Sequence, residues 1–280
     1  MSAIAATDPQ FVLLGSMILW ETLYQLCCIA LRNGGLAEKI SLDPSTIPIL
    51  RNQGPSYIVS IVHSVLLGIL GIKHLRDFLS LTSSEPMLQY SLPPTSTNLE
   101  IYESLKCSNI IFMGYLLFDF YHILQLYPKL GGMDMILHHI LFFSCSIING
   151  YYHILYLPFG WLILGEISTT FLSLRWLLIK TGRGHTVPFK IIQLCFAITF
   201  LVIRVLIYNM GLYHMITSSV LFKLPVPRPF LGIVLLLIGL GSILNLFWAI
   251  KICKMALSVT TTNIGTENGK KINWDKEKSR

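Results

Sequence analysis

Seven long apolar blocks constrain the possible folds of this chain more than any other feature of its sequence. A helix needs roughly 20 mostly apolar residues to cross a bilayer. The chain is 53% hydrophobic and 12% charged, whereas a soluble domain carries about 25% charged residues. We therefore predict an all-α polytopic membrane protein with about seven transmembrane helices, six being the alternative count. The predicted spans are residues 11–31, 57–79, 105–127, 133–149, 151–179, 189–216 and 230–256.

Two turn signals refine these spans. The segment "PKLGG", residues 128–132, is typical of a turn and predicts a tight hairpin between the third and fourth helices. Pro158 lies inside the fifth block, where proline interrupts helical hydrogen bonding. We expect it either to kink the fifth helix or to mark its true start.

The distribution of basic residues predicts the orientation of the chain. If the N-terminus is lumenal, fourteen of the 21 lysines and arginines lie on the cytosolic side and four on the lumenal side. Positive charge is enriched in cytosolic loops, so we predict a lumenal N-terminus and a cytosolic C-terminus, which requires an odd number of spans. Topology also explains the net charge of +7, and no nucleic-acid partner is expected.

The last five residues, "KEKSR", place Lys276 and Lys278 in a K-x-K-x-x pattern. This pattern resembles the retrieval signal that coat proteins read on membranes returning to the endoplasmic reticulum. The alternative is a merely basic, solvated tail. We favour the signal, and with it an endoplasmic reticulum membrane location and coat proteins as partners.

Ionisable side chains inside the predicted spans mark the candidate site. Such groups are costly in a bilayer and usually face a bundle interior or a cavity. Asp119 and the pair His138–His139 lie at similar depths on the two helices of the predicted hairpin, so we expect them to face each other. Asp119 shares a helical face with His122, and Asp134 shares one with His138.

The two adjacent histidines cannot point in the same direction, because neighbouring residues on a helix diverge by about 100°. One can act chemically while the other orients it, or the two can flank a substrate. His138, Cys145 and Asn149 also form a stripe along the fourth span.

The fifth and sixth spans add further polar groups. Glu166, Thr169, Thr170 and Ser173 share one face, while Arg175 points to nearly the opposite side and is expected to meet another helix or lipid headgroups. Arg204, near the middle of the sixth span, needs a carboxylate or a phosphate. We expect Glu166 to be its partner.

A buried histidine beside a carboxylate can act as a general base or nucleophile on an alcohol or amine. Membrane di-iron enzymes need several histidine boxes, and this chain has one histidine pair and scattered single histidines. We predict no metal and no resident cofactor, although spacing alone leaves a single zinc ion open. The non-catalytic alternative is a satisfied polar network between helices.

Four segments, taken in order, resemble the TLC-domain superfamily, which includes the ceramide synthases, the TRAM proteins and several lipid-homeostasis proteins. They are "GYLLFDFYHIL", "YPKLGGMDMILHHILF", "LILGEISTTFLSLRWLL" and "ITFLVIRVLIYNMGLYHM". The resemblance looks closest to the small TLC-domain proteins of the type 4 branch. It covers about residues 56–257, leaving a lumenal N-terminus, first helix and cytosolic loop in 1–55 and a cytosolic tail in 258–280.

The resemblance implies six helices ringed around a lipid-accessible cavity, with His138 and His139 as catalytic residues and Asp119 lining the same cavity. Ceramide synthases carry an acidic L-H-D-x-x-D stretch after their histidine pair, whereas this chain has "GEISTTFLSLRW". The resemblance therefore supports the lipid cavity more than ceramide synthesis itself.

Three functions remain open on the sequence. The first is acyl transfer from acyl-CoA to a lipid amine or hydroxyl. The second is non-catalytic lipid binding that regulates membrane lipid composition. The third is a cargo or translocation accessory role. In the first two, the substrate cavity or polar network is expected to include Asp134, His122, Asn149, Glu166, Thr169, Arg175 and Arg204.

Overall fold

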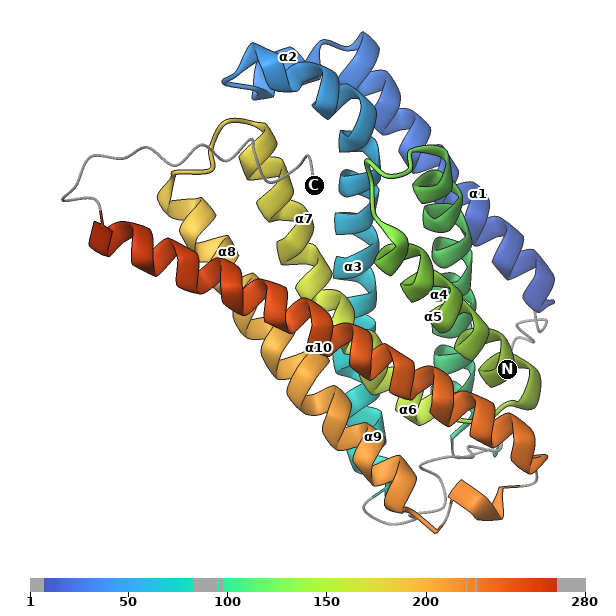
Figure 1. The fold of residues 1–280 in the computed structure, drawn as a ribbon. Coiled ribbons are helices and arrows are strands. Elements are labelled where there is room, and N and C mark those ends of the chain that lie inside the picture. Colours follow the sequence, from blue (N-terminus) through green and yellow to red (C-terminus); the bar gives the residue numbers. More distant parts are fainter. Residues whose placement is uncertain (1–7, 83–94, 96–97, 220, 225, 266–280) are drawn as a thin grey trace.

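The structure is a computed structural model whose helices form a single bundle (Figure 1). It describes residues 8–82, 95, 98–219, 221–224 and 226–265, with side chains for all of these except 82, 157 and 255–265. The α-helices are α1 (Pro9–Cys28), α2 (Leu36–Ile40), α3 (Ile47–Thr82), α4 (Leu99–Gln125), α5 (Met133–Tyr152), α6 (Tyr156–Leu162), α7 (Glu166–Lys180), α8 (Val187–Thr199), α9 (Tyr208–Thr217) and α10 (Arg228–Gly265). Shorter helical segments are η1 (Ile29–Asn33), η2 (Pro44–Thr46), η4 (Ile163–Gly165), η5 (Phe200–Ile207) and η6 (Leu221–Lys223).

The predicted all-α polytopic class and the count of seven spans are confirmed. Among the described residues, seven helical stretches are long and apolar enough to cross a membrane. They are Pro9–Asn33, Pro44–Leu81, Leu99–Gln125, Met133–Tyr152, Pro158–Lys180, Val187–Thr217 and Arg228–Lys254.

The boundary between the fourth and fifth spans differs from the prediction. Tyr151 belongs to α5, and the chain then reverses at His153 and Leu155, which have φ angles of 54° and 60°. Residues other than glycine adopt such left-handed backbone angles only at single positions, so the helix cannot continue through His153 and Leu155. Pro158 lies near the start of the following helix, as the second of the two alternatives for this residue expects.

The second span begins before residue 57, the start of its apolar block, because α3 starts at Ile47 and continues through Pro55. Proline has no N–H to donate to the carbonyl four residues earlier. That carbonyl belongs to Arg51, and the Nε of Arg32 donates to it at 3.1 Å. A side chain at the end of the first span thus supplies the hydrogen bond that the helix loses.

Helices α4 and α5 form the expected hairpin across residues 126–132. We call the end of the bundle where these two helices are joined the hairpin end. The starts of α3 and α5 and the end of α7 lie at this same end (Figure 1). Helix α10 runs diagonally across the bundle, and its C-terminal part lies toward the hairpin end (Figure 1).

Helix α1 lies outside the other six spans, against α3 and α4. Its Trp20 and Tyr24 are buried with Val59 of α3 and with Tyr115 and Phe118 of α4. The opposite side of α1 carries exposed apolar residues, among them Phe11, Leu14, Ile18 and Leu19. The first span therefore packs against the outer side of α3 and α4.

The C-terminal dilysine pattern, Lys276 and Lys278, lies outside the described residues.

Candidate functional site

A cavity of about 410 Å³ opens within the bundle toward the hairpin end. Its wall takes residues from α3, α4, α5, α7, α8 with η5, and α10, so the six spans other than the first surround it. This is the ring of six helices that the resemblance implies. We call it the histidine cavity, because His63, His138 and His139 line it.

Asp119 and His139 meet across the α4–α5 hairpin, which confirms the predicted contact. The Nε2 atom of His139 lies 3.0 Å from the Oδ2 atom of Asp119. Its Nδ1 atom lies 2.9 Å from the backbone carbonyl oxygen of Met135. A carbonyl oxygen only accepts hydrogen bonds, so Nδ1 carries a proton and Nε2 is held by Asp119. His139 therefore has both ring nitrogens engaged and a fixed orientation.

His138 is in a different situation. Its ring is buried against Phe142 and Trp248, with centroid distances of 4.5 and 5.4 Å. Within the described part of the chain it has no hydrogen-bond partner, and its Nδ1 atom is buried. The rings of His138 and His139 are roughly perpendicular, with centroids 5.5 Å apart. One histidine is thus held in place beside another whose ring nitrogens are unengaged.

Arg204 and Glu166 form the buried pair that was expected between the fifth and sixth spans. The Nη2 atom of Arg204 lies 3.1 Å from Oε1 of Glu166 and donates to Oγ1 of Thr169 at 3.0 Å. Its Nε atom donates to the carbonyl of Gly165 and to Oγ of Ser168. A buried charge is tolerated when it is paired and hydrogen-bonded in this way.

Backbone features on both sides allow this pair to form. Arg204 lies in the π-helical segment η5, and π-helical turns are frequent at functional sites. A Cβ atom at position 165 would lie 3.4 Å from Cζ and Nε of Arg204. That distance is ordinary van der Waals contact, so the guanidinium packs directly over residue 165 as its Nε reaches the backbone carbonyl.

His63 is a cavity residue that the sequence analysis missed. It is fully buried, its ring stacks on Tyr115 at a centroid distance of 3.4 Å, and its Nε2 lies 4.0 Å from Oε2 of Glu166. A signal was present, because Ser56, Ser60 and His63 form a polar stripe along one face of α3, and all three line the cavity.

Asp134 and His138 both face α10, as their shared helical face predicts. Oδ2 of Asp134 accepts a hydrogen bond from the indole Nε1 of Trp248 at 2.9 Å and lies 3.4 Å from Nζ of Lys251. These contacts lie at the rim of the cavity, because both partners of Asp134 are wall residues.

Arg175 and Glu166 both lie on the wall of this cavity, as the predicted set of cavity residues includes, although their side chains were expected to point to nearly opposite sides of the helix. The guanidinium carbon of Arg175 lies 5.8 Å from the ring centre of Phe189 on α8. The two residues are nine positions apart, about 13 Å along the helix. A cavity that extends over that length can contact both sides of α7.

Two expected cavity residues are placed elsewhere. His122 turns toward α1, where its Nε2 lies 3.0 Å from Oε2 of Glu21. Three residues along a helix rotate a side chain by about 300°, which leaves His122 some 60° from Asp119. Because α4 contacts both α1 and α5, this rotation turns His122 toward α1 while Asp119 faces α5. Asn149 lines a second, smaller pocket farther along α5.

The chemistry available here is proton transfer or nucleophilic attack by an imidazole. No group of three or more His, Cys, Asp or Glu residues is arranged to hold a metal ion within the described ranges. An unengaged imidazole beside a fixed imidazole–carboxylate pair has the elements of a general base.

Comparisons with known proteins agree with this architecture at the level of the family. No curated protein gives a significant match over the chain. The family model described as the TLC domain, of the TRAM, LAG1 and CLN8 proteins, matches residues 55–254. That match spans the six helices around the histidine cavity, and the chain belongs to the TLC-domain family.

Proposed function

We propose that this protein is a histidine-dependent acyltransferase that moves an acyl chain from acyl-CoA to the amine or hydroxyl of a membrane lipid. The observation that carries the proposal is the pairing of an unengaged His138 with a fixed His139–Asp119 unit inside a cavity of about 410 Å³. A cavity of that volume lies within the range of small-molecule sites. Because the TLC-domain family consists of membrane proteins related to lipids, we take a lipid as the occupant of this cavity.

His138 is the proposed catalytic base. It removes the proton from the lipid amine or hydroxyl as that nitrogen or oxygen attacks the thioester carbonyl carbon. The carbon–sulfur bond then breaks, the new amide or ester remains on the lipid, and the proton passes from His138 to the departing CoA thiolate. His139 and Asp119 act as positioning residues, because both ring nitrogens of His139 are already engaged.

The position of the cavity fits a cytosolic donor. It opens toward the hairpin end, which the charge distribution predicts to be cytosolic, so the charged part of acyl-CoA stays at the surface while its thioester enters. Arg175 and Lys251 line the wall toward this end and supply positive charge for the phosphates of CoA. No resident metal or cofactor is needed in this scheme.

Acyl transfer is tested with the purified full-length protein, labelled acyl-CoA and a membrane lipid extract that supplies amine and hydroxyl acceptors. We expect a labelled lipid product, and the variant His138→Ala is expected to lower its rate by about 100-fold or more. The matched control is His185→Ala, which removes an exposed histidine in the connection between α7 and α8 and should leave the rate unchanged.

Thermal unfolding of each variant distinguishes a lost base from a lost fold. If the wild-type protein binds lipid but forms no product, the non-catalytic lipid-binding alternative replaces this proposal. If product formation survives in His138→Ala and in His139→Ala, the histidine pair is not the catalytic site.

The proposed location is the endoplasmic reticulum membrane, with a lumenal N-terminus and a cytosolic tail recognised by coat proteins. Replacing Lys276 and Lys278 with serine should move a fluorescently tagged protein forward to the Golgi. Unchanged residence in the endoplasmic reticulum would show that the dilysine pattern is not the address, whatever the activity of the cavity.

A further inference from the structure

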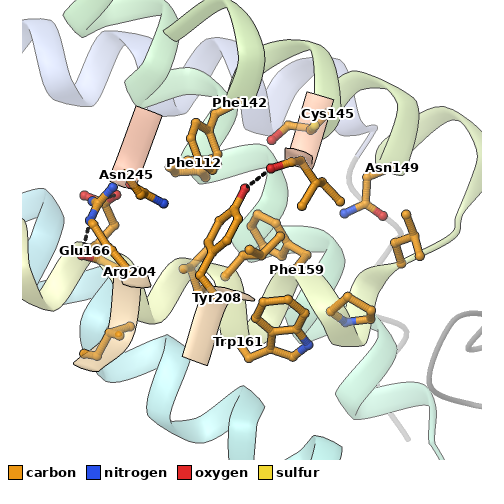
Figure 2. A pocket seen from close by; sticks show the side chains of 18 of the residues that line it. Phe112, Phe142, Cys145, Asn149, Phe159, Trp161, Glu166, Arg204, Tyr208 and Asn245 are labelled. Atoms are coloured by element: carbon orange, nitrogen blue, oxygen red, sulfur yellow. Dashed lines mark hydrogen bonds and ion pairs between the residues drawn. The ribbon is translucent and has the colours of Figure 1, made fainter. Parts of the chain in front are cut away.

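A second, smaller pocket lies directly beyond the histidine cavity. It measures about 50 Å³, and its wall includes Phe112, Glu166 and Arg204, which also line the histidine cavity. The buried Arg204–Glu166 pair therefore stands between the two spaces. Figure 2 shows this pair with Asn245 on one side of the pocket, Tyr208 in the middle and Asn149 on the far side.

Most of the wall of this pocket is apolar and aromatic. Phe112, Phe142, Phe159 and Trp161 contribute rings to it, and Figure 2 shows them around the pocket. The hydroxyl of Tyr208 is already satisfied, because it donates to the carbonyl oxygen of Ile238 at 2.9 Å. Such a surface suits the methylene groups of a lipid chain.

Two amide atoms do not fit a purely apolar occupant. Asn149 is 5% exposed and Asn245 is 1% exposed. Among the described residues, Oδ1 of Asn149 and Nδ2 of Asn245 have no hydrogen-bond partner. A buried polar atom without a partner is costly and in most proteins finds one. A plain hydrocarbon chain in this pocket would leave both amide atoms unpaired.

We propose that the small pocket binds the distal part of an acyl chain that carries a hydroxyl group. A hydroxyl both donates and accepts, so it can donate to Oδ1 of Asn149 or accept from Nδ2 of Asn245. Asn149 is eleven positions beyond His138 on α5, about 16 Å along the helix. A chain whose reacting end lies at His138 therefore brings its distal half, and not its first carbons, to these amides.

The inference rests on the proposed function in one respect, that the chain enters through the histidine cavity. It is tested by binding alone, so it does not need turnover. The probes are three free fatty acids of equal length: one unsubstituted, one with a mid-chain hydroxyl and one with a terminal hydroxyl. Their affinities for the purified full-length protein are measured by native mass spectrometry in a lipid-free detergent.

We expect at least one hydroxylated chain to bind roughly three- to tenfold more tightly than the unsubstituted chain, which is the gain of one net hydrogen bond. The double variant Asn149→Leu/Asn245→Leu keeps similar side-chain volume and removes both amides. It should lose the preference and bind the unsubstituted chain at least as well as the wild type does. Asn209→Leu is the control, because Asn209 bonds Val205 and Ser242 away from the pocket, and it should keep the preference.

Equal binding of the three chains by the wild type would overturn the inference, as would a preference that survives in the double variant. A protein that binds none of the three also overturns it, and water then remains the partner of the two amides. A clear preference without any acyl transfer would instead remove the proposed function and leave this site standing.

Discussion

Helix α4 carries one member of each of two histidine–carboxylate pairs, and the pairs have the same geometry but different surroundings. Asp119 meets His139 of α5 at 3.0 Å, and His122, three residues later, meets Glu21 of α1 at 3.0 Å. The first pair lines the histidine cavity. The second lies between α1 and α4, where the Glu21 side chain is 43% exposed on the outside of the bundle.

The comparison shows that pairing by itself does not define a site. The inner pair has an unengaged imidazole beside it and a cavity that can admit a substrate. The outer pair has the ring of Tyr24 packed over His122 at a centroid distance of 4.0 Å. Position relative to the cavity, not the hydrogen bond, separates a candidate catalytic unit from a contact that holds α1 to the bundle.

The largest expected difference between the pairs is in activity. Asp119→Asn should lower kcat for acyl transfer by about 100-fold or more, because Nε2 of His139 loses its carboxylate partner and the ring is no longer held in place beside His138. The KM for acyl-CoA should change little, since the wall residues remain. Glu21→Gln is the matched change at the outer pair and should keep the wild-type kcat. Equal losses in the two variants would mean that Asp119 acts only through the fold.

The inner pair could be predicted from the sequence because its geometry is local. The "PKLGG" turn sets α4 and α5 antiparallel, and the positions of Asp119 and His139 relative to that turn give them similar depths. The Arg204–Glu166 contact followed from a different argument, that a cation deep in a span needs a carboxylate. Both inferences rest on physical requirements that few alternative partners could meet.

The outer pair and His63 could not be placed by the same reasoning. The partner of His122 lies 101 positions earlier in the chain, and nothing local to α1 shows which side of α4 it covers. The periodicity placed His122 near the face of Asp119, and a difference of some 60° was enough to turn it away. His63 was missed because a single histidine in an apolar block carries little signal unless it is taken together with Ser56 and Ser60.

A smaller effect is expected on stability at the outer pair. His122→Leu should cost about 1–2 kcal/mol, because the buried His122 ring loses its hydrogen bond to the carboxylate, while the exposed Glu21 keeps Gln25 as a partner. The double variant Glu21→Leu/His122→Leu should regain most of that loss, since replacing both partners of a hydrogen bond with apolar groups can be nearly neutral. Reversible unfolding in mixed micelles measures both variants. A double variant no more stable than the single one would show that the pair itself holds α1 in place.

The smallest effect is expected at Asp134, a third carboxylate, whose partners lie on the cavity rim. The Lys251 side chain is 57% exposed and its Nζ lies 3.4 Å from Oδ2 of Asp134, so Lys251→Met should change the free energy of unfolding by less than about 1 kcal/mol. Trp248→Phe removes the 2.9 Å indole bond and should cost about 1 kcal/mol. The same micelle unfolding measurement ranks the two. If Lys251→Met proved as costly as His122→Leu, exposure would not be what weakens a carboxylate contact in this bundle.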